Sequence, residues 1–64
     1  MMYDYLFVLT EYSENEGELL LVETTSIGEA YRSLIQTHGF REEELSFVRR
    51  MSVEEGEMYG FDTY

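Results

Sequence analysis

Residues 26–40 carry the signals for both ends of a helix, and they limit the possible folds of this 64-residue chain more than any other stretch. Ser26 and Glu29 have the spacing of a capping box, in which the serine hydroxyl accepts a hydrogen bond from the Glu29 amide and the Glu29 carboxylate accepts one from the Ser26 amide. Gly39 supplies the left-handed residue that commonly follows a helix, and Phe40 can then fold back on the last turn. Between these signals the side chains on one helical face are Ile27, Ala30, Tyr31, Leu34, Ile35 and His38. We therefore predict a helix over residues 27–38.

Three apolar runs around this helix have the composition of β-strands. Residues 3–10 alternate between two faces that both become apolar toward the middle, which is typical of a central strand. Residues 18–25 follow after a polar loop, so the two runs predict an antiparallel hairpin. Residues 45–51 predict the third strand.

The third strand carries the one basic pair of the chain. Alternation places Leu45, Phe47 and Met51 on one face and points Arg49 and Arg50 to opposite faces. We expect each arginine to pair with local carboxylates, with an interface contact as the alternative, because arginine is enriched in binding hot spots.

A second capping box, Ser52 with Glu55, predicts a short helix that Gly60 closes. Gly56 lies inside that helix, where glycine costs about 1 kcal/mol relative to alanine. The chain then ends in an aromatic segment rather than a polar one. We expect this segment to dock on its own domain or on a second chain, through Met58, Tyr59, Phe61 and Tyr64.

The element order β-β-α-β-α predicts one small α+β domain over residues 1–64. The economical arrangement is a three-stranded antiparallel sheet in the order 2-1-3, with the main helix on one face and a short C-terminal helix. The second face needs a cover from the C-terminal residues or from a partner. Its apolar side chains are expected to be Leu6, Val8, Leu20 and Val22, or their neighbours on each strand.

The charge balance limits the possible partners. Fourteen acidic residues face four arginines and no lysine, so the net charge is −10. This charge opposes binding to nucleic acid and to anionic membranes, and it favours a basic protein partner. It also opposes self-association, so between a monomer and a homodimer we favour the monomer. The chain has no cysteine and no apolar run near the roughly 20 residues of a membrane span, which predicts a cytoplasmic protein.

No pattern in the chain predicts catalysis. His38 is the only histidine, and its place in the last helical turn suits the helix dipole. Paired carboxylates are present, but acid–base work needs one of them buried in a pocket, for which so short a chain has little room. The acidic loop before Gly17 lacks the spacing of a calcium loop. We therefore expect no enzyme, no cofactor and no metal site.

Two functions remain. The first is a small acidic, non-enzymatic module that binds a basic protein partner. The second is a nucleic-acid mimic of the phage or plasmid type, which inhibits a basic protein by occupying its DNA or RNA site and therefore needs carboxylates in rows on one face. The candidate partner-binding residues are Glu42, Glu43, Glu44, Glu54, Glu55, Glu57, Arg49, Tyr59 and Phe61.

Overall fold

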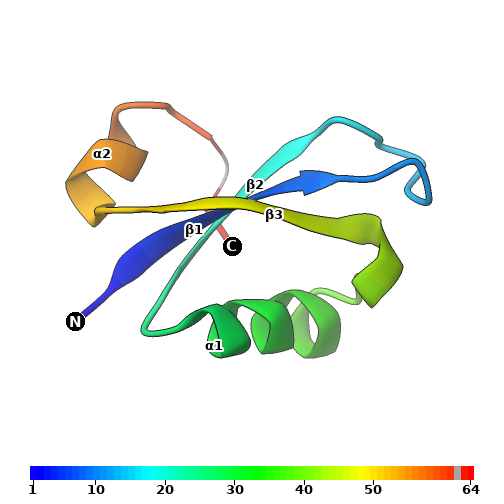
Figure 1. The fold of residues 1–64 in the computed structure, drawn as a ribbon, viewed down its shortest axis with the longest axis horizontal. Helices are drawn as coiled ribbons and strands as arrows, with labels where there is room; N and C mark the ends of the chain where they lie inside the picture. The colour runs from blue at the N-terminus through cyan, green and yellow to red at the C-terminus, as the bar shows by residue number, and fades with distance from the viewer. Residues whose placement is uncertain (62) are drawn as a thin grey trace.

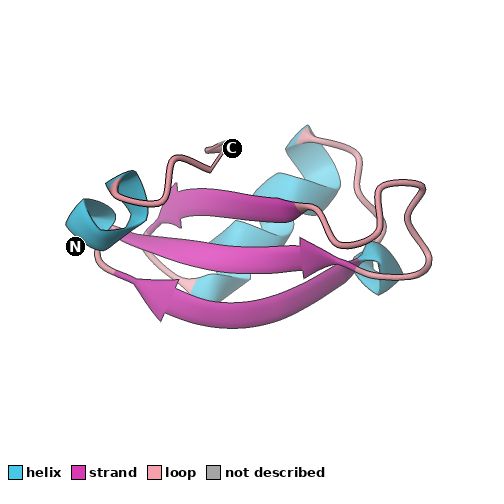
Figure 2. Ribbon diagram, turned by 90° about the horizontal axis from the view of Figure 1, so that it is seen from above, coloured by secondary structure: helices cyan, strands magenta, loops and turns pink. Residues whose placement is uncertain are grey.

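The structure, a computed structural model that describes residues 1–61 and 63–64, has the predicted α+β architecture (Figure 1). The three strands form one antiparallel sheet in the predicted order, β2-β1-β3 (Figure 2). The main helix consists of α1 and a π-helical turn, η1, and lies on one side of the sheet, while α2 lies on the other. In chain order the elements are β1 (Tyr3–Leu9), β2 (Leu19–Thr24), α1 (Ile27–Arg32), η1 (Ser33–Thr37), the 3₁₀ turn η2 (Glu42–Glu44), β3 (Leu45–Met51) and α2 (Val53–Glu57).

The sheet divides the core into two parts. Strand register explains the division, because Phe7 pairs with Leu20 and Leu6 pairs with Leu21 across β1 and β2. The part under the main helix consists of Tyr5, Phe7, Leu9, Leu20, Val22, Ala30, Leu34 and Leu45. The part under α2 consists of Leu6, Leu21 and Met51, with Leu19 and Phe61 packed against them. The second face therefore takes Leu21 from β2, whereas Leu20 and Val22 belong to the helix side.

A β-bulge interrupts the pairing of β3 with β1. Phe47 pairs with Phe7 and Arg49 pairs with Leu6, so Val48 is an extra residue on β3. Such a bulge adds one residue to one strand and changes the alternation beyond it.

The bulge corrects the predicted faces of β3. Leu45 packs in the core under the main helix, and Phe47 shares this face, as predicted, with its ring 5.6 Å from the Phe7 ring. Met51, however, packs with Leu6 under α2. The prediction that Met51 shares a face with Leu45 and Phe47 was wrong, because the extra residue turns the end of the strand over.

The main helix begins where the sequence predicts. The Ser26 hydroxyl accepts a hydrogen bond of 3.2 Å from the Glu29 amide. The Glu29 carboxylate lies 3.6 Å from the Arg32 guanidinium, an exposed pair one turn along the helix. The serine half of the capping box is thus present, while the glutamate carboxylate makes an ion pair.

The end of the main helix differs from the prediction by one residue. The last turn, Ser33–Thr37, is π-helical, and His38 is the capping residue rather than the last helical one. Gly39 follows with a φ of 79°. The Phe40 amide then donates a 3.0 Å hydrogen bond back to the Leu34 carbonyl, one residue farther back than in a Schellman motif because the last turn is π-helical.

Replacing Ser26 by alanine is expected to lower the free energy of unfolding by about 1 kcal/mol, because the Glu29 amide loses its acceptor. Chemical denaturation measures the change. The matched control is Thr25→Ala, one residue earlier on the exposed surface, for which we expect a change within about 0.5 kcal/mol. Equal losses in the two variants would contradict the capping role.

The C-terminal residues dock on their own chain, as expected, but not all of them take part. Phe61 packs against the core under α2. Thr63 forms a parallel bridge with Leu21 at the outer edge of β2, and Tyr64 packs against the core on the helix side. Met58 is 85% exposed, Tyr59 is 50% exposed and Tyr64 lies on the helix side, so the expectation that these three side chains cover the second face was wrong.

Candidate functional site

The loop between β1 and β2 and the turn η2 lie together at one end of the molecule (Figure 1). The Thr10 hydroxyl donates a 2.6 Å hydrogen bond to the Glu43 carbonyl, and the Thr10 amide donates one of 2.9 Å to the Glu44 carbonyl. The Arg41 guanidinium donates to the Tyr12 carbonyl at 2.9 Å. These bonds join two segments that are about thirty residues apart in the sequence.

This end, which we call the loop end, holds half of the fourteen acidic residues. They are Glu11, Glu14, Glu16, Glu18, Glu42, Glu43 and Glu44. Arg41 is the arginine among them, with Nη1 at 2.7 Å from Glu43 Oε1 and Nη2 at 3.6 Å from Glu44 Oε1. The other five carboxylates are exposed, so the loop end presents a strongly negative surface.

The other end of the molecule, around α2, gathers four more of the predicted residues. Arg49 Nη2 lies 3.1 Å from Glu55 Oε1 and 3.3 Å from the Tyr59 hydroxyl. The Tyr59 ring stacks on the Phe61 ring at a centroid distance of 5.6 Å. Arg49 therefore has the local carboxylate partner that we expected, and it tethers α2 to β3.

The nine predicted partner-binding residues thus form two groups and not one. Glu42–Glu44 precede β3, whereas Arg49, Glu55, Tyr59 and Phe61 gather around α2 at its far end, where Glu54 and Glu57 also lie on the exposed surface. Since β3 has seven residues, its two ends are roughly 20 Å apart. The acidic loop and Glu42–Glu44 converge, while the acidic residues of α2 stay separate.

Asp4 is a residue that the sequence analysis missed. Its side chain lies under α2, and the residue is only 3% exposed. Its Oδ1 atom has no hydrogen-bond partner among the described residues. Burial raises the pKa of Asp4, and the nearby charges of Glu23 and Glu57 raise it further.

Gly56 was the signal for this contact. A Cβ atom on Gly56 would lie 2.8 Å from Asp4 Cγ and 3.2 Å from Asp4 Cβ, so only glycine lets α2 come this close to β1. The glycine that costs helix propensity is therefore explained by packing. The glycine indicates that some segment packs closely against α2, but the sequence pattern does not identify Asp4 as that segment's residue.

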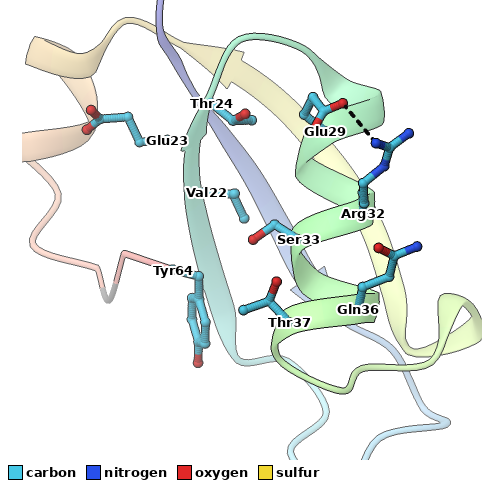
Figure 3. A pocket seen from close by; sticks show the side chains of 9 residues that line it. All are labelled: Val22, Glu23, Thr24, Glu29, Arg32, Ser33, Gln36, Thr37 and Tyr64. Carbon is cyan, nitrogen blue, oxygen red and sulfur yellow. Dashed lines mark ion pairs between the residues drawn. The ribbon is translucent and has the colours of Figure 1, made fainter.

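A groove of about 240 Å³ runs between β2 and the main helix (Figure 3). It was not predicted. Its walls carry mostly polar side chains: Val22, Glu23 and Thr24 from β2, Glu29, Arg32, Ser33, Gln36 and Thr37 from the main helix, and Tyr64 at one end. Three of the helix residues belong to the π-helical turn, a local distortion that is frequent at functional sites.

The remaining chemistry of the described residues is limited. His38 is exposed, and its ring meets the Tyr64 ring edge-to-face at 5.0 Å. In residues 1–61 and 63–64, no three histidine, cysteine or acidic side chains are placed to hold a metal ion. No helix in the same part of the chain is long and apolar enough to cross a membrane.

The chain matches no protein-family model, no curated protein and no solved structure.

Proposed function

We propose that this protein is a small acidic, non-enzymatic binding module of the cytoplasm whose loop end binds a basic segment of a partner protein. The observation that carries the proposal is the convergence of the first loop with Glu42–Glu44, where seven acidic residues share one end with one arginine. No other described region gathers as many like charges.

The bonds inside the loop end favour binding over simple solubility. Backbone and side-chain contacts of Thr10 and Arg41 hold the two acidic segments against each other, so less order has to be gained when a partner binds. An acidic surface of this kind accelerates the approach of a basic partner and selects against acidic ones. The net charge of −10 opposes pairing of two copies through the same surface, so we propose a monomer in the absence of a partner.

The arrangement of the charges favours this function over nucleic-acid mimicry. A mimic needs its carboxylates in continuous rows on one face, whereas the length of β3 separates the acidic residues of α2 from those of the loop end. Mimicry makes a distinct prediction, since a mimic would compete with duplex DNA or RNA for a basic nucleic-acid-binding protein. A module that binds basic segments generally would also bind basic proteins that have no nucleic-acid site.

The partner is expected to bind through exposed carboxylates of the loop end. The test compares two double variants of equal net charge. The loop-end variant carries Glu16→Gln and Glu42→Gln, and the matched variant carries Glu29→Gln and Glu54→Gln. All four side chains are exposed; Glu16 and Glu42 lie at the loop end, whereas Glu29 lies on the main helix and Glu54 on α2. Because each exposed ion pair contributes about 0.2–1 kcal/mol, the loop-end variant should bind roughly two- to thirtyfold more weakly.

The measurement starts from proteins retained on the immobilised chain at low salt and released at high salt. The identified partner is then purified, and its affinity for each variant is measured by calorimetry. We expect a basic partner whose affinity falls for the loop-end variant and changes little for the matched one. Equal effects of the two variants, or a partner without a basic segment, would count against the proposal.

A further inference from the structure

The outer edge of β2 has backbone groups that point away from the sheet. Leu9 and Glu18 form a hydrogen-bonded pair next to the loop, since the Leu9 amide donates to the Glu18 carbonyl at 2.9 Å. Hydrogen-bonded and non-hydrogen-bonded pairs alternate along an antiparallel ladder. The residues of β2 whose amides and carbonyls face outward are therefore Leu19, Leu21 and Glu23.

An extended segment already pairs with this edge. The Tyr64 amide donates a 2.7 Å hydrogen bond to the Leu21 carbonyl, and Thr63 forms a parallel bridge with Leu21. The Tyr64 ring then lies on the helix side of the sheet, 5.0 Å from the His38 ring and 6.0 Å from the Phe40 ring. The edge thus accepts a parallel β-bridge, with an aromatic side chain at the next position.

The groove continues beyond Tyr64 along the direction of β2. Tyr64 lies at one end of it, with Thr24 farther along, and Ser33 and Thr37 point from the helix toward the strand (Figure 3). Alternate side chains of a strand project to the same face. On a parallel strand longer than the docked residues, the side chain two positions after the aromatic one would therefore enter the groove beside Thr24. The hydroxyls there suit a side chain that makes hydrogen bonds.

We propose that the edge of β2 and this groove together form a binding site for an extended segment of a partner protein, added as a parallel strand. The segment carries an aromatic residue at the position of Tyr64 and Asn, Gln, Ser or Thr two residues later, and it displaces residues 63–64. Addition of a strand to a sheet edge takes affinity from main-chain bonds and specificity from alternate side chains. The site is separate from the loop end and does not depend on its charge.

The docked residues act as a competitor within the same chain. Because the docked residues belong to the same chain, their effective concentration is roughly millimolar, and an added peptide must exceed that level to replace them. Gly60, with a φ of 67°, lies ahead of these residues in the turn that follows α2. Weakening the contact of Tyr64 should therefore strengthen the binding of an added peptide.

The test titrates two acetylated tetrapeptides, Thr-Tyr-Gly-Asn and the same peptide methylated on the tyrosine amide nitrogen, into the full ¹⁵N-labelled chain. The methyl group removes the donor that corresponds to the Tyr64 amide and leaves every side chain in place. Neither peptide has a basic residue, so the loop end has no reason to bind it. The titrations use the wild-type chain and Tyr64→Ala.

We expect the first peptide to shift the amide signals of Leu21, Glu23 and Thr37 in a saturable way at millimolar concentration. In Tyr64→Ala it should bind at least about tenfold more tightly, because the internal competitor is weaker. The methylated peptide should leave these signals unchanged in both chains. Equal shifts with both peptides, or no shifts in the wild-type chain, would overturn the proposal; the wild-type titration decides the matter if Tyr64→Ala does not fold.

Discussion

Replacing Asp4 by asparagine is expected to raise the free energy of unfolding at pH 7 by about 1–3 kcal/mol. The Asp4 carboxylate is buried, and its Oδ1 atom has no hydrogen-bond partner among the described residues. The amide keeps the shape of the side chain and removes its charge. The charges of Glu23 and Glu57 disfavour the charged form of Asp4. The asparagine amide instead offers hydrogen-bond donors to these neighbouring carboxylates.

The stability gained by replacing Asp4 with asparagine is expected to grow as the pH rises. Because the pKa of Asp4 is raised above its ordinary value of 3.8, folding favours the protonated form. The stability that this proton contributes is fully present below pH 3.8 and is lost as the pH rises through the higher folded value. The difference between Asp4→Asn and the wild type should therefore be small at pH 3.5 and should grow toward pH 7.

Denaturation by urea at several pH values measures this difference. Glu16→Gln is the control, since it removes one carboxylate from the exposed surface of the loop end and should change stability by less than about 0.5 kcal/mol. A stability difference for Asp4→Asn that stays constant between pH 3.5 and pH 7 would contradict a raised pKa of Asp4 in the folded chain.

Replacing Gly56 by alanine should destabilise the chain by about 1–3 kcal/mol, although helix propensity alone predicts a gain of up to about 1 kcal/mol. The added methyl group would collide with the Asp4 side chain, which has little room to move because it is buried. A loss of stability in Gly56→Ala therefore supports the packing explanation, whereas a gain would mean that helix propensity dominates.

Gly28→Ala is the matched control for this substitution. Gly28 also lies in a helix, but a Cβ atom there would meet only the Ser26 hydroxyl oxygen, at 3.9 Å. Alanine at position 28 should therefore stabilise the chain by about 0.5–1 kcal/mol. Thermal and urea denaturation of both variants test the pair, and a stabilising effect of Gly56→Ala would refute the close contact.

A double variant that carries both Asp4→Ala and Gly56→Ala tests the contact between these two positions. Alanine at position 4 removes the carboxyl group that the new methyl would meet, so most of the loss caused by Gly56→Ala should be recovered. Additive effects of the two substitutions would mean that the residues do not interact.

Local chemistry determined the elements of this fold. Ser26 and Gly39 mark the ends of the main helix through hydrogen bonds to residues a few positions away, and such signals can be recognised in any sequence. The apolar middle of β1, present on both of its faces, indicated a central strand, because both faces at the centre of the sheet are covered by other segments. The charge of the chain, and with it the class of partner that we propose, also follows from composition.

Contacts between distant residues determined the rest. Val48 became a bulge because of how β3 pairs with β1, and that extra residue moved Met51 to the other face of the sheet. The position of Asp4 under Gly56 depends on where α2 packs. Thr10 and Arg41 join the first loop to Glu42–Glu44 through bonds that span about thirty residues, so the loop end exists only in the folded chain.

The candidate sites likewise combine residues that the sequence shows with an arrangement that only the folded chain provides. The sequence contains the acidic residues of the loop end, but their convergence depends on the order in which the strands pair. The groove beside β2 depends on three segments at once: the strand edge, the π-helical turn and Tyr64. A periodic pattern reports which side of its own element a residue faces. It carries no information on which other element lies there, because that choice is made by the packing of the whole chain.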